Sequence, residues 1–382
     1  MLEIDPDPGK FIAYKIILSD IIDDIQYTPL DNTCPIGRSL KLRIVGGKIY
    51  LSIRDGIVQF EHNGKFLRKI GRQGRGPGEY SYGWEFAVDE LSGNIFVSDY
   101  GKIKVYSPGG VFLRDIHTEK YGDSNHIFNI EVFNSLIFIP DFNNLGNSEY
   151  NWVFIDTLGM LVSKKENSAP KFLGGVEING FQSYLTGSGN TYRFGNRLFY
   201  YNYFNDTIFA ISSDLSYQGI YLFAGDNRLP KEYVKIASSQ LDAFLYKTFI
   251  PYSIFETNQF LVFLYEYQNK STIAFIDKKN NQTFEASSSK IDPGSFKKAK
   301  LLIINDFDGG LPLANDFKHY SINGEGYIAA FINPIDLKQY VSSSEFKNIV
   351  PKYPEKKESF RKMAESVNEM DNPILVTAHL KK

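Results

Sequence analysis

The chain has 382 residues and carries 42 Lys and Arg residues against 44 Asp and Glu residues, so no net positive charge favours binding to nucleic acid or to an anionic membrane. Aromatic residues make up 15% of the sequence, and because such side chains favour pleated strands, the composition predicts an all-β protein. No apolar run is long enough to cross a bilayer as a transmembrane segment, and the single cysteine, Cys34, excludes an internal disulfide.

The amino-terminal segment holds two strand-like stretches, "FIAYKIILSD" and "DIQYTPL", that have no counterpart later in the chain. The first residues, "MLEIDPDPGKF", lack the basic and apolar regions of a signal peptide, as they also would in a trimmed mature chain. A strand without a repeat at this end is available to complete a sheet elsewhere in the fold.

An internal repeat follows. Residues 46–71 and 92–117 share an apolar strand after Gly, a polar turn, an alternating strand, a Gly turn and the motif G-x-FLR-x-I. Six copies of the leading apolar strand are recognisable, beginning at Ile49, Ile95, Ile137, Leu198, Phe260 and Tyr327. The first two intervals fall within the roughly 40 to 50 residues of a four-stranded propeller blade. The sequence therefore predicts one domain over residues 1–382, a six-bladed β-propeller.

A second, alternating strand follows in five of the six units and ends in a turn typical of hairpins. In the sixth unit that strand is delayed until "PILVTAHL", because a charged, helix-favouring segment near residues 336–371 comes first. We interpret this segment as a partly helical insertion with a solvated surface or, alternatively, as a partner-docking helix. The last blade is then short of a strand, and pairing with the amino-terminal strand closes the ring.

A glycine-rich loop, "GRQGRGPGEY", follows the first repeat. It is not a phosphate-binding loop, because a strand pattern rather than a helix follows it and Pro77 removes a backbone donor. Its glycines favour a structural role in which Gly71, Gly74, Gly76 and Gly78 allow positive φ or close backbone approach. The alternative is a contact surface for a carboxylate or sugar acid, formed by Arg72, Arg75, Glu79 and Tyr80.

Polar residues end several of the repeated strands. Asp99, Asp141 and Asn202 stand four residues past three of the strand starts, and Arg54 stands near the end of the first strand. If these strands line the axis of the propeller, the polar groups converge on one axial mouth, where they form a binding pocket or supply oxygen ligands to calcium. The ordinary alternative is that Asp after a strand stabilises its own turn.

Other motifs favour structure over catalysis. Residues 305–310, "NDFDGG", offer oxygen atoms but lack the distal ligands of a calcium loop, which favours a tight turn. The five histidines are scattered, and no G-x-S-x-G elbow occurs, so zinc hydrolysis and serine catalysis are disfavoured. Calcium is the one cofactor that the sequence leaves open.

Residues 70–116 resemble the repeat of NHL-type six-bladed β-propellers, with a Gly-rich loop, the strands "AVD" and "GNIFVSD" and the turn "VYSPGG" in the same order. The stretches "LSDIIDDIQYTPLD", "NDTIFAISSDL", "NDFDGGLPL" and "DNPILVTAHLKK" resemble landmarks of a largely uncharacterised family of six-bladed propeller proteins from gut-dwelling Gram-negative bacteria. This resemblance implies the fold and implies export to the periplasm or cell surface, often as a lipoprotein. It implies little about function, because propellers host many activities.

The patterns together predict a rigid, monomeric binding scaffold for a glycan, peptide or protein ligand, without catalytic activity. The alternative is a calcium-assisted hydrolase, lactonase or lyase that acts at the axial mouth. The two hypotheses differ in one geometric respect: the enzyme requires Asp99, Asp141 and Asn202 to lie within metal-ligand reach of each other.

Overall fold

The protein is represented by a computed structural model. It describes residues 1–37, 41–81, 83–121, 127, 129–142, 148–168, 176–178, 181–183, 189–225, 227, 246–268, 270–287, 301–314 and 317–381.

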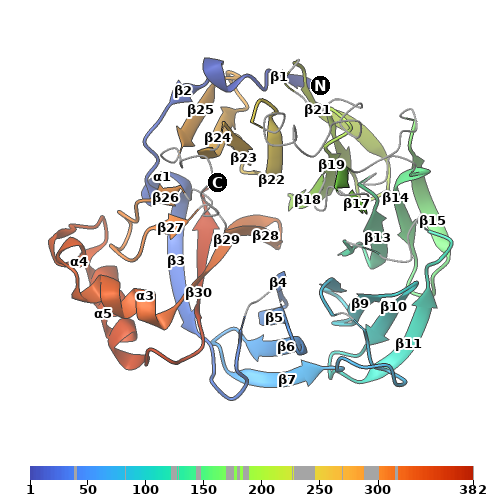
Figure 1. Cartoon of the computed structure of the whole chain (residues 1–382), viewed down its shortest axis with the longest axis horizontal. Helices are drawn as coiled ribbons and strands as arrows, with labels where there is room; N and C mark the ends of the chain where they lie inside the picture. Colours follow the sequence, from blue (N-terminus) through green and yellow to red (C-terminus); the bar gives the residue numbers. More distant parts are fainter. Residues whose placement is uncertain are drawn as a thin grey trace.

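Six four-stranded antiparallel sheets, the blades, are arranged in a ring (Figure 1). Blade 1 contains β4 (Lys41–Val45), β5 (Lys48–Ile53), β6 (Gly56–Glu61) and β7 (Phe66–Ile70). Blade 2 contains β8 (Phe86–Val88), β9 (Ile95–Asp99), β10 (Lys102–Tyr106) and β11 (Phe112–His117). Blade 3 contains β12 (Glu131–Phe133), β13 (Leu136–Pro140), β14 (Tyr150–Ile155) and β15 (Leu161–Glu166).

The second half of the ring follows the same plan. Blade 4 contains β18 (Gly189–Phe194), β19 (Arg197–Asn202), β20 (Thr207–Ile211) and β21 (Tyr217–Phe223). Blade 5 contains β22 (Ile250–Glu256), β23 (Phe260–Tyr267), β24 (Lys270–Asp277) and β25 (Thr283–Ser287). Blade 6 contains β28 (Lys318–Ile322), β29 (Glu325–Ile332), β30 (Ile374–Leu380) and β3 (Ile22–Pro29). The predicted six-bladed architecture is confirmed.

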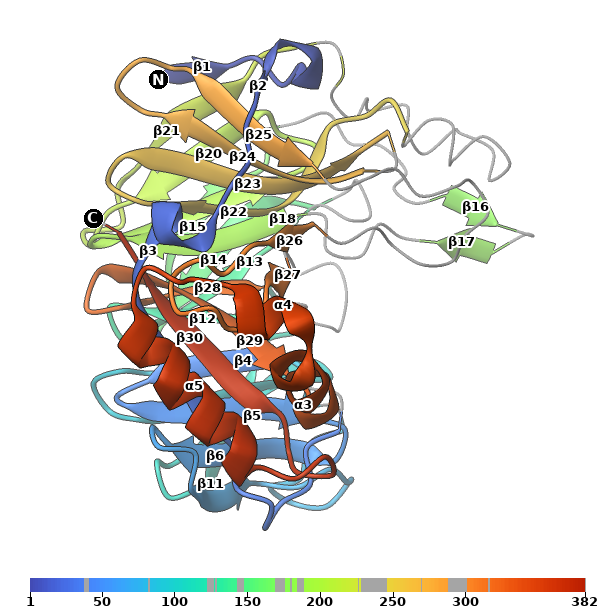
Figure 2. The same ribbon diagram turned by 90° about the vertical axis from the view of Figure 1, so that its left-hand side faces the viewer.

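The amino-terminal segment closes the ring, as expected from the unmatched strand "DIQYTPL". Strand β3 pairs antiparallel with β30 over Ile22–Pro29 and forms the outer strand of blade 6. Upstream, β1 (Leu2–Ile4) and β2 (Ile12–Ala13) add parallel to the outer strands of blades 4 and 5, with the short helices η1 (Pro8–Lys10) and α1 (Leu18–Ile21) between these strands. The first 29 residues therefore fasten three consecutive blades along the outside of the ring (Figures 1 and 2).

The apolar core lies between the blades. Separate clusters fill the space between blades 1 and 2, 2 and 3, 3 and 4, and 6 and 1, and one larger cluster joins blades 4, 5 and 6. The rings of Trp152 in blade 3 and Tyr200 in blade 4, for example, have their centroids 5.0 Å apart. Alternation along each strand directs successive side chains to opposite neighbours, so the second and third strands of the blades are largely buried on both faces, whereas an outer strand such as β15 is partly exposed.

The helical insertion of the last blade lies between β29 and β30, as predicted, outside the ring beside β3 (Figure 1). It contains α3 (Pro334–Ser342), α4 (Ser344–Asn348) and α5 (Pro354–Ser366). Leu337, Phe346 and Phe360 join the large core cluster, and the rings of Phe360 and Tyr27 approach to 4.8 Å. The insertion is thus packed on the closing strand β3. Two small hairpins complete the described elements: β16 (Val176–Ile178) with β17 (Phe181–Ser183), and β26 (Leu302–Ile303) with β27 (Leu313–Ala314).

The repeated strands recognised in the sequence are not the innermost ones. Those beginning near Ile49, Ile95, Ile137, Leu198, Phe260 and Tyr327 are β5, β9, β13, β19, β23 and β29, and each is second in its blade. The strands that meet around the axis are β4, β8, β12, β18, β22 and β28 (Figure 1). The premise that the recognised strands line the axis was wrong, because the innermost strands of blades 2 and 3 have only three residues and carry little periodic signal.

Candidate functional site

One end of the ring collects most of the residues singled out in the sequence. Lys41 at the start of β4 lies opposite Ser52 near the end of β5, and Gly189 at the start of β18 lies opposite Asn202 at the end of β19. The innermost strands therefore begin on the same face on which the second strands end. We call it the loop face, and the β16–β17 hairpin projects from it (Figure 2). Arg54, Asp99, Asp141 and Asn202 share this face but lie one strand away from the axis.

The glycine-rich loop joins the outer strand of blade 1 to the inner strand of blade 2, and Tyr80 anchors it. The Tyr80 side chain is fully buried, its hydroxyl group donates to the carbonyl oxygen of Ile70 at 2.8 Å, and it accepts from the backbone N–H of Ile57 at 2.9 Å. Burial raises the pKa of Tyr80 to about 12. Tyr80 therefore holds the seam between the blades and is not placed to contact a ligand.

Glu79 is also occupied within the loop. Its carboxylate accepts from the backbone N–H of Gly76 at 2.8 Å and pairs with the Arg72 guanidinium, and both interactions lower its pKa. A Cβ atom on Gly74 would lie 2.0 Å from Glu79 Oε2, so a side chain there would displace the Glu79 carboxylate from this position. Gly71 and Gly78 have φ of 57° and 73°. Close approach at Gly74 and positive φ at Gly71 and Gly78 thus give these glycines a structural role in the loop.

The arginine side chains of this part of the loop face are exposed to solvent. Arg72 keeps 79% of its side-chain surface exposed despite its ion pair, and Arg75 is exposed. Arg54 is likewise exposed, in the turn between β5 and β6. Their role in ligand binding stays a prediction.

Asp99, Asp141 and Asn202 each stabilise a turn or a neighbouring strand connection. Asp99 Oδ1 accepts from the backbone N–H of Ser81 at 3.1 Å. Asp141 Oδ1 accepts from the Ser148 hydroxyl group at 2.7 Å, and Asn202 Oδ1 accepts from the backbone N–H of Phe204 at 3.0 Å. These are the interactions expected of polar residues in turns.

Two of the three calcium candidates are connected, through a tyrosine rather than through a common centre. The Tyr200 hydroxyl group donates to the backbone carbonyl oxygen of Asp141 and accepts from Asn202 Nδ2 at 2.8 Å. These hydrogen bonds join blade 3 to blade 4, whereas Asp99 bonds to Ser81 within blade 2's own loop connection. Across the residues that the structure describes, no group of three or more His, Cys, Asp or Glu side chains is arranged to hold a metal ion.

A cluster of charged and polar side chains at the axis joins blades 1 to 4. We call it the axial cluster; its members are Lys41, Arg43, Glu85, Asn129, Glu131, Thr191 and Arg193.

The layer of the axial cluster nearer the loop face is built around Lys41. Its ammonium group lies 2.7 Å from Glu85 Oε2, just before β8, and 3.4 Å from Asn129 Oδ1, just before β12. Asn129 Nδ2 in turn lies 3.5 Å from the Thr191 hydroxyl oxygen on β18. Side chains of four blades are thereby connected across the axis.

The deeper layer is built around Arg43. Its guanidinium donates to the carbonyl oxygens of Phe86 at 3.4 Å and Ile130 at 3.2 Å, and to Glu131 Oε1 at 2.7 Å. The Glu131 side chain is only 16% exposed. Burial alone would raise its pKa, but Arg43, Lys41 and Arg193 outweigh that effect and lower it, so Glu131 is an anion.

Arg193 is the second cation of this deeper layer, and its environment differs from that of Arg43. It lies on β18 with its guanidinium 5.7 Å from the centroid of the Phe133 ring, and it makes no hydrogen bond or ion pair to any other residue within the described part of the chain. Burial lowers its pKa, and Glu131 opposes that shift. An arginine nevertheless stays protonated in proteins. The axial cluster therefore contains a partly desolvated cation, Arg193, whose N–H donors are not used by any other described residue.

The axial cluster was missed in the sequence. Its signal is the alternation of cations with apolar residues directly before a recognised strand, in "LKLRIV" and "NTYRFGNRL". Because the recognised strands were taken as innermost, the residues one strand earlier were not considered.

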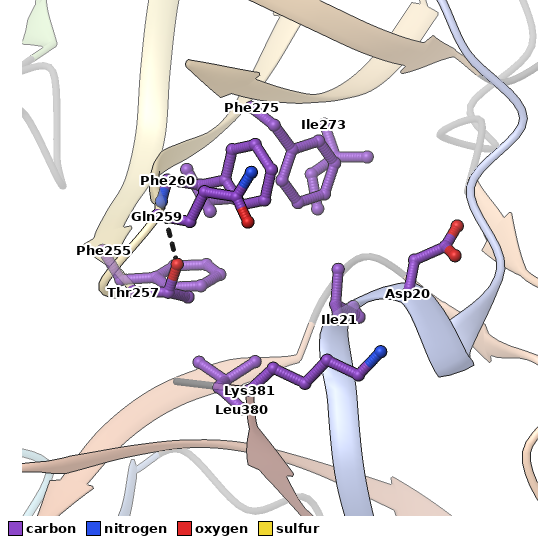
Figure 3. Close-up of a pocket in the computed structure, with 11 residues that line it drawn as sticks. Asp20, Ile21, Phe255, Thr257, Gln259, Phe260, Ile273, Phe275, Leu380 and Lys381 are labelled. Carbon is purple, nitrogen blue, oxygen red and sulfur yellow. Dashed lines mark hydrogen bonds between the residues drawn. The ribbon is translucent and has the colours of Figure 1, made fainter. Parts of the chain in front are cut away.

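A small pocket lies between blades 5 and 6 (Figure 3). Phe255, Phe260 and Phe275 form its apolar wall, and Asp20 and Lys381 lie at its rim. Its cavity volume of about 90 Å³ is the space of a few water molecules and is smaller than the sites that bind organic ligands. We therefore do not regard it as the main site.

The "NDFDGG" segment is a structural turn, as expected. Asn305 Oδ1 accepts from the backbone N–H groups of Phe307 and Asp308, and Asp308 Oδ1 accepts from Gly310 N at 2.9 Å. The Tyr27 hydroxyl group on β3 donates to the same Asp308 oxygen at 3.2 Å. The turn thus ties the closing strand to the region beneath the helical insertion.

The helices that the structure describes include none with both the length and the apolar sequence needed to cross a membrane.

The fold and the axial cluster together define a six-bladed β-propeller with a charged axis. The chain belongs to the family described as "Domain of unknown function (DUF4934)", whose model matches residues 11–379. No curated protein matches it.

A solved structure supports the architecture. A "Putative exported protein (BF0058)" from Bacteroides fragilis NCTC 9343 is similar with a TM-score of 0.67 and 17% identity, and the match covers 100% of this chain and 99% of that one. A member of the DUF4221 family from Bacteroides vulgatus ATCC 8482 has a TM-score of 0.47 and 13% identity, with 94% and 98% covered. At 17% identity the likeness to the protein from Bacteroides fragilis shows the fold alone.

Proposed function

We propose that the protein is a non-catalytic binding scaffold whose axial cluster holds a carboxylate group of its ligand. The observation that carries this proposal is Arg193. Its guanidinium is partly desolvated, lies at the axis and has no acceptor within the described residues, whereas Lys41 and Arg43 have theirs.

The chemistry of arginine favours a carboxylate over other ligand groups. A guanidinium presents five N–H donors in a planar fork that matches the two oxygens of a carboxylate, and such bidentate bonds are stronger than neutral hydrogen bonds. Glu131 is held on Arg43 at 2.7 Å, which fixes its position. A ligand carboxylate would accept from the N–H donors of Arg193, since Glu131 accepts from Arg43 instead.

The setting is that of a rigid receptor. Arg43 is fixed by two backbone carbonyl oxygens and a carboxylate from two other blades, so its side chain loses little further freedom when a ligand binds. Of the glycan, peptide and protein ligands predicted from the sequence, those that bear a carboxylate, such as an acidic glycan, fit this site.

We extend the proposal to the location of the protein. The "Putative exported protein" from Bacteroides fragilis shares the whole fold. Together with the sequence resemblance, this supports export to the periplasm or the cell surface, with the monomeric state, the lipoprotein form and the NHL type of repeat as further predictions.

The proposal is tested by a thermal-shift screen that pairs carboxylates with matched neutral compounds, for example galacturonate oligomers with galactose oligomers. A ligand present at ten times its dissociation constant stabilises a protein by about 1.4 kcal/mol. We expect carboxylate ligands to raise the melting temperature by about 2 °C and neutral ones to leave it unchanged. Arg193→Gln should abolish the shift, whereas Lys279→Gln, in an exposed turn, should retain it. Equal shifts with both classes of ligand would contradict the proposal.

A further inference from the structure

The helical insertion carries a groove. It is far from the axial cluster in the sequence and lies outside the ring of blades. Helix α3 contributes Lys338, Val341 and Ser342, helix α4 contributes Phe346 and Lys347, and helix α5 contributes Lys357, Arg361, Ala364 and Glu365. The cavity volume of this groove is about 580 Å³, within the range of sites that take organic ligands and peptide side chains.

The floor of the groove is apolar. Phe346 and Ala364 are buried, and Val341 is half-buried between them. Pro334 begins α3 and Pro354 begins α5, and a connection that includes the short helix α4 places the two longer helices side by side. The groove is therefore part of the packed insertion rather than a space left by an exposed loop.

The walls of the groove are basic. Four cations line it against one carboxylate, that of Glu365. Arg361 is neutralised by Glu358 and Glu365 on its own helix. Lys338, Lys347 and Lys357, in contrast, have no carboxylate partner within the described residues.

Two of these lysines are held in place without being neutralised. Lys357 Nζ donates to the carbonyl oxygen of Ile349 at 2.7 Å and lies 4.8 Å from the centroid of the Phe346 ring. Lys338 Nζ donates to the carbonyl oxygen of Ala364 at 3.3 Å. Backbone carbonyls satisfy donors but do not cancel charge, so the positive potential of the groove remains.

We propose that this groove is a docking site for an acidic peptide segment of a partner protein, with an apolar side chain of the segment on the Val341–Phe346–Ala364 floor. Charge complementarity supplies the argument: the three lysines would pair with Asp or Glu residues that flank the apolar residue. An anionic membrane fits less well, because Glu355, Glu358 and Glu365 are exposed on the same helix α5 and would oppose a lipid surface.

The experiment is panning of a random 12-residue peptide library on the full-length protein. We expect selected sequences to be enriched in Asp and Glu on both sides of a Leu, Ile or Phe residue. Synthetic copies with a fluorescent label should then bind in anisotropy titrations, and raising the salt from about 50 to 300 mM should weaken them, because paired surface charges are screened.

Charge-reversed variants test whether the selected peptides bind in the groove. Lys338→Glu together with Lys347→Glu should weaken the selected peptides at least tenfold. The matched control reverses two charges outside the groove, Lys352→Glu and Lys362→Glu, and should bind as the unaltered protein does. If the double variant in the groove does not fold, Lys347→Glu alone serves, because the Lys347 side chain is exposed and makes no hydrogen bond within the described residues. Arg193→Gln should bind the peptides normally, which separates this site from the axial cluster.

The proposal is overturned if panning enriches no acidic sequence, or if the selected peptides bind the groove variants as tightly as the control. A parallel sedimentation assay uses vesicles of phosphatidylglycerol and phosphatidylcholine. Sedimentation that depends on Lys338 and Lys347, without peptide binding, would assign the groove to a lipid surface instead.

Discussion

The hydroxyl group of Tyr80 donates a hydrogen bond to the carbonyl oxygen of Ile70 at 2.8 Å, and this contact joins the glycine-rich loop to the outer strand of blade 1. The Tyr80 hydroxyl oxygen accepts from the backbone N–H of Ile57, so one buried side chain bonds two backbone groups of blade 1 at its seam with blade 2.

Tyr80→Phe should therefore destabilise the protein by about 1–3 kcal/mol, because it removes the hydroxyl group that two buried backbone groups bond to. Urea denaturation checks the value. Tyr217→Phe, which removes a hydroxyl group from a tyrosine that is 47% exposed, serves as the control and should cost less than about 0.5 kcal/mol. Equal stabilities of the two variants would show that the seam does not depend on Tyr80.

Deletion of residues 1–30 should abolish cooperative unfolding. It removes β3, the outer strand of blade 6, and exposes the edge of β30 over seven residues. Deletion of residues 1–13 alone removes β1 and β2 but keeps β3, and should lower the melting temperature while leaving a single transition. Calorimetry distinguishes the two outcomes, and a protein without residues 1–30 that melts like the full chain would contradict the closure.

His319 should make the protein sensitive to acid. Its ring stacks on Phe255 at 4.7 Å, its Nε2 atom is buried without a hydrogen-bond partner within the described residues, and burial lowers its pKa to about 3. In the unfolded chain the pKa of histidine is near 6.5, so between pH 6.5 and about 3 the unfolded state binds the extra proton. The stability contribution is complete above pH 6.5 and is lost as the pH falls, by up to about 1.4 kcal/mol per pH unit.

The measurement is the free energy of unfolding against pH for the unaltered protein and for His319→Phe, which keeps a ring on Phe255. The variant should lose less stability between pH 6.5 and 4, and the difference between the two curves isolates this residue from the carboxylates. Parallel curves would mean that His319 is protonated in the folded protein.

Reversing the charges of Arg72 and Arg75 should leave folding nearly unchanged. Both side chains are exposed, and the ion pair from Arg72 to Glu79 is screened by solvent, so it contributes little to stability. A melting temperature within about 2 °C of the unaltered protein is expected for Arg72→Glu combined with Arg75→Glu. Changed binding of a ligand by this variant would support the loop as a contact surface; a large loss of stability would contradict the structural explanation given above.

The sequence allowed the blade count and the closure to be predicted because the second and third strands of each blade are buried on both faces and repeat. The stretches "GKIYLSI" and "GNIFVSD" predict β5 and β9. The stretch "DIQYTPL" has no repeat of its own and is part of β3. The helical insertion was likewise predictable from its charged, helix-favouring composition.

The axial cluster could not be predicted in the same way. Glu131 and Arg193 are 62 residues apart in the numbering, and they approach only because β12 and β18 are innermost strands of neighbouring blades. Asp99, Asp141 and Asn202 illustrate the opposite case. Their pattern fitted both a pocket and a turn, and in the structure their side-chain oxygens accept hydrogen bonds within turns and strand connections.

The central claim, that Arg193 receives a ligand carboxylate at the axis, is tested most directly by isothermal titration calorimetry with the strongest acidic ligand of the thermal-shift screen. The measurement compares the unaltered protein, Arg193→Gln and the control Lys279→Gln at one low salt concentration. We predict one binding site in the unaltered and control proteins and at least a tenfold weaker affinity in Arg193→Gln, since a charge-assisted hydrogen bond contributes about 1.5–3 kcal/mol. The same affinity in all three proteins would contradict the assignment of the axial cluster as the binding site.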